Sequence, residues 1–133
     1  MNPSITPRTG FDIPRRRALD NLIRPTRAEV CAPALRHNLK VARKLAAPAE
    51  VMAVVKANAY GHGAVQVARV LEDEGVAMLG VALVEEGLEL RAAGVKAPIL
   101  VMGGSYEGGY ALMVEHRLTP TLFRREHIAG LIA

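Results

Sequence analysis

The stretch VMAVVKANAYGHG, residues 51–63, decides the fold of this chain. It opens with an apolar run at 51–56 that ends in Lys56, and it closes on Gly61 and Gly63 just before a helical pattern begins. A short, almost entirely apolar run is typical of a parallel strand that is buried on both faces. The stretch therefore predicts a strand–turn–helix unit, with Lys56 at the carboxyl end of the strand.

Similar apolar runs recur every 20 to 26 residues along the chain. They are AEVC (28–31), VMAVVK (51–56), AMLGVAL (77–83), PILVM (98–102) and LTPTL (118–122). Helical patterns fill the intervals, at 34–46, 64–74, 85–93, 107–116 and 124–133. Strand, helix and strand at this spacing predict parallel strands that are joined by crossover helices.

The buried faces of the first three helices are predicted from apolar residues at three- and four-residue steps. These stripes are Leu35, Leu39, Ala42 and Ala46; then Ala64, Val67, Ala68 and Leu71; then Leu88 and Ala92. Gly75 and Gly94 follow the second and third helices, where glycine commonly ends a helix.

Two folds fit this alternation, an open doubly wound sheet and a (β/α)8 barrel. The regular length of the units favours the barrel, which typically needs ~250 residues. The chain has 133 residues, and five strands do not close a barrel. We therefore expect an α/β fold that forms the first half of a (β/α)8 barrel, with two open strand edges and an uncovered apolar face.

The composition predicts a folded body and no metal site. Half of the residues are hydrophobic, which excludes disorder over most of the chain. The single cysteine, Cys31, excludes an internal disulfide and a zinc cluster, and it fits a reducing, cytoplasmic compartment. Its place in the first apolar run predicts a buried, inert thiol. The four histidines show no shared metal-ligand spacing.

The positive charge of the chain lies in its first residues. Residues 1–27 carry six arginines and two aspartates, whereas residues 28–133 carry 11 basic and 11 acidic side chains. A basic tail can bind nucleic acid or an anionic membrane, and its ordinary alternative is a solvated leader. We expect residues 1–26 to form an extended, poorly ordered leader, and residues 27–133 to form the domain. A solvated leader gives no nucleic-acid partner, and no run reaches the ~20 apolar residues of a membrane span, so we expect neither a nucleic-acid partner nor a membrane partner.

Lys56 and Tyr60 are the side chains with the clearest chemical potential. In parallel α/β folds the carboxyl ends of the strands carry the active site, and a neutral lysine amine there can attack a carbonyl and form a Schiff base. Its structural alternative is a lysine whose stem covers apolar surface while its head reaches water. Tyr60, with the helix start after Gly63, could bind a phosphate; the alternative is a rigid loop with Tyr60 covering the barrel end.

The motif AVVKANAYGHG, preceded by RPTRAEV and ALRHNL and followed by GVALVEEGLELRAAGV and APILVMGG, resembles the start of bacterial alanine racemases. The resemblance covers about residues 24–133. It implies a fold-type III pyridoxal-phosphate barrel, followed in the family by a C-terminal β domain. The family usually has an acidic residue where this chain has Cys31.

The resemblance also assigns roles to four residues. Lys56 matches the lysine that holds pyridoxal 5′-phosphate covalently and serves as the base for the α-proton of the D-enantiomer. Tyr60 matches the tyrosine that hydrogen-bonds the cofactor phosphate, and Val54 and Leu83 match apolar residues near the cofactor ring. The implied activity is interconversion of L-alanine and D-alanine, which supplies D-alanine for peptidoglycan, in a cytoplasmic homodimer.

Other parts of the family's site have no match in this chain. They are the acid/base on the opposite face, a tyrosine of the partner subunit's C-terminal domain, and the arginines that assist the cofactor. We therefore expect an N-terminal part of an alanine racemase, ending within its fifth helix and inactive alone. The residues leave open serine or another small amino acid as substrate. Two other classes also stay open, a non-catalytic pyridoxal-phosphate barrel protein and a cofactor-free lysine aldolase.

Overall fold

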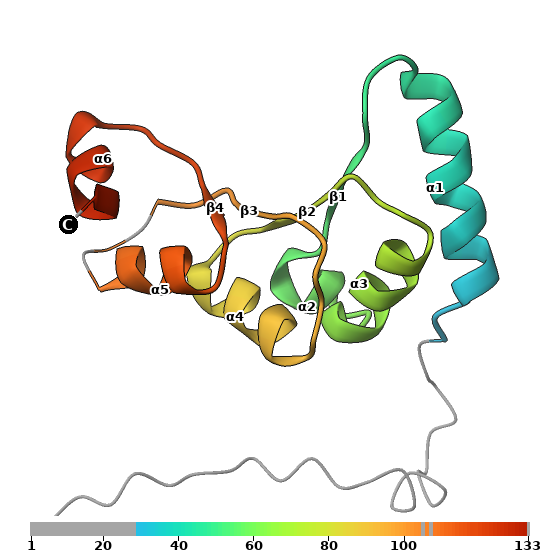
Figure 1. Cartoon of the computed structure of the whole chain (residues 1–133). Helices are drawn as coiled ribbons and strands as arrows, with labels where there is room; N and C mark the ends of the chain where they lie inside the picture. Colours follow the sequence, from blue (N-terminus) through green and yellow to red (C-terminus); the bar gives the residue numbers. More distant parts are fainter. Residues whose placement is uncertain (1–28, 105, 107, 133) are drawn as a thin grey trace, which may run out of the picture.

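The computed structural model describes residues 29–104, 106 and 108–132. Within these residues, the strands number four and form one parallel sheet in the order β1-β2-β3-β4. Consecutive strands therefore lie side by side, as in the wall of a barrel (Figure 1). The strands are β1 Met52–Val54, β2 Met78–Val81, β3 Ile99–Val101 and β4 Thr119–Pro120. Each lies inside one of the predicted apolar runs.

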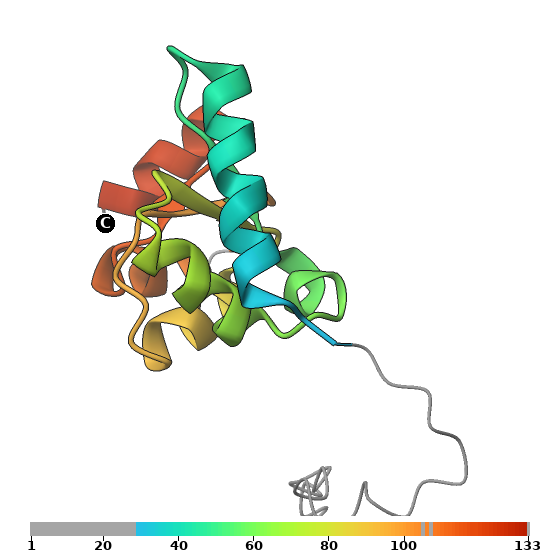
Figure 2. The same ribbon diagram turned by 90° about the vertical axis from the view of Figure 1, so that its right-hand side faces the viewer.

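Helices follow every strand, and the first helix precedes them all. They are α1 Ala32–Ala46, α2 Lys56–Tyr60, α3 Ala64–Asp73, α4 Val84–Ala92, α5 Gly109–Glu115 and α6 Arg125–Ile132. Helices α3, α4 and α5 lie on one side of the sheet (Figure 1). The long helix α1 packs against α3 at the β1 end, and it stands in front of the sheet in the turned view (Figure 2).

The strand predicted at 28–31 is wrong for residues 29–31, the part of it that the structure describes. Residues 29–31 pair with no strand, and Cys31 is the residue that immediately precedes α1. Pro33 lies in the first turn of α1, where the missing N–H of proline is tolerated, so the helix begins earlier than expected. The prediction of a buried Cys31 is also wrong, because the side chain is exposed. The described part thus contains four strand–helix units, which is the count of half an eight-stranded barrel. The predicted leader, residues 1–26, lies outside the described residues.

The two faces of the sheet differ in burial because side chains alternate along each strand. The helix-covered face carries side chains with no exposed area at all, namely Leu79, Val81, Ile99 and Val101. We call the opposite side the open face; it carries Met52, Val54, Gly80, Leu100 and Met102. A Cβ on Gly80 would lie 3.4–3.5 Å from atoms of Met52, Val54 and Met102, which confirms that these side chains share one face. The α/β architecture with parallel strands is the one predicted, and it is consistent with the first half of a (β/α)8 barrel.

Two of the three predicted helix stripes are confirmed. All four stripe residues of α3 are buried, and in α1 Leu39 is buried while Leu35, Ala42 and Ala46 are half-buried. The stripe predicted for the third helix is wrong in part: Leu88 is half-buried against the core, but Ala92 is exposed. The fully buried residues of α4 are Val84, Gly87 and Leu90. The reason is Gly87, which apolar periodicity does not count. A Cβ there would lie 2.9 Å from Cδ1 of Leu118, so the missing side chain lets Leu118 pack against the helix backbone.

The predicted helix ends at Gly75 and Gly94 are confirmed, since α3 ends at Asp73 and α4 at Ala92. Both glycines have positive φ, 74° and 86°. At each end the backbone makes the paired hydrogen bonds of a Schellman motif, Val76 N–H to Leu71 O and Val95 N–H to Leu90 O among them.

An arginine from the preceding helix then binds the carbonyl oxygens at each of these ends. Arg43 of α1 donates to Glu74 O and Gly75 O after α3, and Arg69 of α3 donates to Ala93 O after α4. Arg91 of α4 donates to His116 O and Arg117 O after α5. Because cations favour helix C-termini, this repeated contact ties each unit to the next.

Candidate active site at the carboxyl ends of β1 and β2

The four residues predicted for the site lie around one edge of the sheet. Val54 is the last residue of β1, Lys56 follows two residues later, and Tyr60 ends α2. Leu83 immediately precedes α4, just after β2. Because β1 and β2 are parallel and Val54 pairs with Gly80, the carboxyl ends of the two strands meet at the same edge. The structure therefore places all four where parallel α/β proteins bind their ligands.

The segment after Lys56 is a turn of left-handed helix, which the sequence reasoning missed. Ala57, Asn58, Ala59 and Tyr60 have φ between 51° and 56°. Left-handed helical conformation costs roughly 1–2 kcal/mol for each residue other than glycine. Four consecutive residues of this kind persist only where surrounding contacts hold them, and such strain clusters at functional sites.

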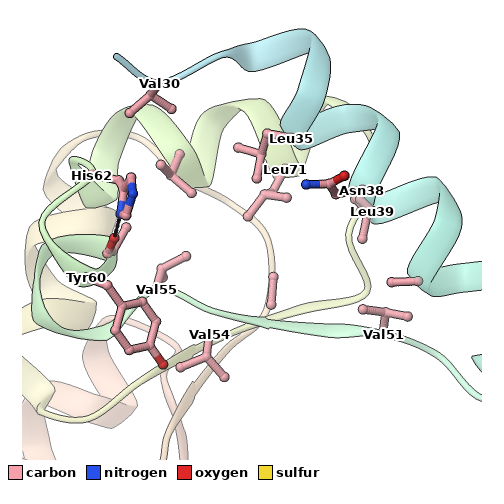
Figure 3. Close-up of a pocket in the computed structure, with 14 residues that line it drawn as sticks. Val30, Leu35, Asn38, Leu39, Val51, Val54, Val55, Tyr60, His62 and Leu71 are labelled. Atoms are coloured by element: carbon pink, nitrogen blue, oxygen red, sulfur yellow. Dashed lines mark hydrogen bonds between the residues drawn. The ribbon is translucent and has the colours of Figure 1, made fainter. Parts of the chain in front are cut away.

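Two polar side chains within the motif hold this left-handed turn. Oδ1 of Asn58 accepts the N–H of Ala64 at 2.7 Å and so caps α3. Nδ1 of His62 lies 2.8 Å from the carbonyl oxygen of Ala59, the contact drawn as a dashed line in Figure 3. His62 thus lies in the turn between α2 and α3. The N–H of Ala64 is already taken by Asn58, so it is not among the free amides that could bind an anion.

A third side chain, Glu86 of α4, reaches the turn from another unit of the fold. Its Oε1 accepts the N–H of Ala57 at 2.6 Å, and its Oε2 accepts the N–H groups of Ala82 and Leu83 at 2.8 and 3.1 Å. Burial raises the pKa of Glu86, but the three N–H donors and the positive charge of Lys56 outweigh it and lower that pKa below its ordinary value. Glu86 is therefore an ionised carboxylate at neutral pH. The sequence reasoning missed this residue; the only local signal was its place as the third residue of α4, where a glutamate often binds the N–H before the helix.

The predicted site residues differ in their exposure. Lys56 and Val54 are half-buried, whereas Tyr60 and Leu83 are 59% and 53% exposed. Figure 3 shows the ring of Tyr60 beside Val54, on the opposite side of β1 from Leu35 and Leu71. Tyr60 is thus an exposed side chain and Lys56 a partly exposed one at this edge.

A cavity of about 380 Å³ lies next to this edge, between α1, β1 and α3. Its walls are mostly apolar, and Val54 and Tyr60 line it (Figure 3). Lys56 and Leu83 do not line it. The cavity is therefore a neighbour of the predicted site and not its reactive centre. A second hollow, of about 280 Å³, lies between the starts of α4 and α5 and is lined by Leu83, Gly104 and Tyr106, among others.

The residues at the edge fit a carbonyl cofactor that carries a phosphate. Lys56 supplies a primary amine, Tyr60 supplies a hydroxyl donor, and Val54 and Leu83 supply apolar contacts for a ring. Gly80 leaves the open face beside Val54 without a side chain of its own. Residues 29–104, 106 and 108–132 hold no group of three acidic, histidine or cysteine side chains that could bind a metal ion. None of the helices in this same part of the chain is both long and apolar enough to cross a membrane.

Comparison with known proteins gives one consistent result. Residues 30–133 match the family described as "Alanine racemase, N-terminal domain". The alanine racemase of Carboxydothermus hydrogenoformans is 46% identical over 104 residues, which are 78% of this chain and 28% of that protein. The structure of alanine racemase from E. faecalis superposes with a TM-score of 0.73 at 34% identity, covering 82% of this chain and 30% of that one. A histidine racemase from Leuconostoc mesenteroides gives a TM-score of 0.69 at 34% identity, covering 75% and 27%. The chain thus spans less than a third of the length of each of these relatives.

Proposed function

Because the chain belongs to the alanine racemase N-terminal domain family, we propose that it forms the lysine-bearing half of a pyridoxal-phosphate-dependent alanine racemase. Residues 27–133 make up this half-barrel domain, and residues 1–26 precede it as a leader. The observation that carries the proposal is the position of Lys56. Lys56 is half-buried and lies two residues after the end of β1, and the left-handed turn that follows it ends at Tyr60.

Each residue of the site has a distinct task in this proposal. The Nζ of Lys56 would hold the cofactor covalently and, as a free amine, would remove or return the proton at one face of the substrate α-carbon. The hydroxyl of Tyr60 donates a hydrogen bond to the cofactor phosphate. Val54 and Leu83 exclude water from the faces of the ring. Pyridoxal 5′-phosphate, when bound, accepts the electron pair left by the α-proton.

Alanine is the substrate that the family description favours, and the product would be D-alanine for peptidoglycan. A second substrate class, a different amino acid, is supported by the match to a solved histidine racemase at 34% identity. None of the four site residues is assigned to the substrate side chain, so they fit both. From the family resemblance we also propose a cytoplasmic homodimer. The opposite-face acid/base would come from the partner subunit, from a segment with no match in this sequence.

The test of the proposal is to trap the cofactor on the chain. The 133-residue chain is incubated with pyridoxal 5′-phosphate and reduced with borohydride, and the labelled peptide is mapped. The expected label is on Lys56, and Lys56→Ala should remove it. A label spread evenly over the exposed Lys40, Lys44 and Lys96 would refute the assignment.

A second measurement separates a racemase from the other classes. A non-catalytic carrier would show the label on Lys56 in a complete protein but no interconversion of enantiomers, and a lysine aldolase would not retain the phosphate cofactor. We propose that residues 1–133 alone do not racemise alanine, because they supply a base on one face only. D-alanine formation from L-alanine within ~10-fold of a full-length relative's rate, a difference of about 1.4 kcal/mol, would contradict this.

A further inference from the structure

The backbone around Lys56 is fixed to the neighbouring unit from both sides. The N–H before it, of Val55, donates to the carbonyl oxygen of Gly80 at 2.8 Å. The N–H after it, of Ala57, donates to Oε1 of Glu86 at 2.6 Å. Val55 is almost completely buried, so its bond belongs to the core of the sheet. The bond to Glu86 is different, because it depends on a single side chain from α4.

The carboxylate of Glu86 binds two separate backbone segments, so its length fixes the distance between them. Its Oε2 binds Ala82 and Leu83 at the start of α4, and its Oε1 reaches across to the turn that begins at Lys56. One rigid carboxylate group thus sets the distance between the end of β2 and the first residue of the left-handed turn. A carboxylate is the natural group for this position, since it accepts hydrogen bonds at both oxygens and donates none.

The turn needs such a contact. Ala57 is the first of four residues in the left-handed region, and alanine gains nothing there from its own side chain. Asn58 and His62 hold the later part of the turn. Among the residues that the structure describes, Glu86 provides the side-chain hydrogen bond to the first residue of the turn, next to Lys56.

We propose that Glu86 is a positioning residue for Lys56, and that its carboxylate keeps the left-handed turn wound so that the amine points to the ligand edge. The inference rests on the proposed function, because it gives Glu86 a purpose beyond capping α4. If Glu86 served only as a helix cap, its loss would lower stability and leave the relative reactivity of Lys56 unchanged.

The variants separate position, charge and capping. Glu86→Gln keeps the length of the side chain but has one acceptor oxygen and places an N–H₂ group against an N–H donor. Glu86→Asp keeps the charge but is one methylene shorter and cannot span both sites. Glu85→Gln is the matched control, since Glu85 lies on the same first turn of α4 and is exposed. It removes the same charge from the helix start without touching the turn.

The readouts are backbone protection and site-specific labelling. Amide hydrogen exchange of Ala57 is measured in each variant, and pyridoxal 5′-phosphate with borohydride labels the lysines, with Lys40, Lys44 and Lys96 as internal references. In Glu86→Gln and Glu86→Asp we expect faster exchange at Ala57 and at least about a tenfold fall in the labelling of Lys56 relative to the references, the equivalent of one lost charge-assisted hydrogen bond. Glu85→Gln should match the unmodified chain in both measurements.

The outcomes distinguish the inference from the function on which it rests. If the unmodified chain is labelled at Lys56 and both Glu86 variants keep that preference, Glu86 is a cap only and the inference is wrong, while the proposed function stands. If Glu86→Asp alone keeps full labelling, the effect is one of charge and the positioning role is wrong. If the unmodified chain shows no preference for Lys56, the proposed function fails and the inference fails with it.

Discussion

Gly103 offers a sharp test of how closely the end of β3 approaches the candidate site. A Cβ at this position would lie 2.4 Å from the carbonyl oxygen of Ala82, where ordinary contacts begin at 3.4 Å. The N–H of Gly103 donates to that same oxygen at 3.0 Å. In Gly103→Ala the two segments must therefore separate by about 1 Å. Ala82 would move with them, and its N–H is bound by Glu86.

The size of the effect follows from two contributions. Overpacking of this kind typically costs about 1–3 kcal/mol, and a weakened backbone hydrogen bond adds about 0.5–1.5 kcal/mol. Against these, alanine in place of glycine restricts the unfolded chain and contributes about 0.4–1 kcal/mol of stability. Gly104→Ala is the matched control, because a Cβ on Gly104 meets nothing within 4 Å. The unfolded-chain gain is common to both variants, so their difference isolates the clash and should be about 1.5–4.5 kcal/mol.

Urea unfolding followed by far-UV circular dichroism measures this difference. We expect Gly103→Ala to unfold at clearly lower urea than Gly104→Ala, with similar slopes for both. Free energies of unfolding within about 0.5 kcal/mol of each other would refute the reasoning, since surface changes without a clash fall in that range.

Three further predictions follow from the same geometry. Tyr60→Phe should weaken the affinity for pyridoxal 5′-phosphate about 10- to 150-fold, the equivalent of one hydrogen bond to a charged group; an unchanged dissociation constant would mean that the hydroxyl faces elsewhere. The lowered pKa of Glu86 means that the folded chain binds fewer protons than the unfolded chain. Its contribution to stability is complete above about pH 4.3, the ordinary glutamate pKa, and is lost as the pH falls through the lower folded value. Acid titration of the free energy of unfolding should therefore fall less steeply in Glu86→Gln, and parallel curves would contradict this. Arg91→Met removes a guanidinium that donates to carbonyl oxygens of Val95, Ala97, His116 and Arg117, and should lower the free energy of unfolding by about 1.5–3 kcal/mol. Arg124→Met is its control, because Arg124 is exposed. Equal free energies of unfolding for the two variants would show that the hydrogen bonds of Arg91 do not stabilise the fold.

Sequence reasoning succeeded where the signal is local. The runs around Val54, Leu79 and Val101 predicted parallel strands, and β2 and β3 are mostly buried, as their apolar runs indicated. Strand β1 is exposed or half-buried throughout, so burial on both faces was wrong for it. The helix ends at Gly75 and Gly94 were also predictable, since the positive φ at the end of a helix strongly favours glycine. It failed at the run 28–31, whose described residues 29–31 have no neighbouring strand among the described residues. A run of four residues carries too little pattern to reveal that.

From residue 32 onward the sequence by itself determined the alternation of strands and helices, except for α2, and it placed Lys56 at the carboxyl end of a strand. It could do so because run length and helical period are properties of neighbouring residues. Only the tertiary structure decided which face α4 buries, how the backbone winds after Lys56, and what holds it there. The contact from Ala57 to Glu86 spans 29 residues, and Gly87 becomes a core position only because Leu118 packs onto it. Both depend on the parallel alignment of units that are separate in the chain, and no local pattern records the distance between them.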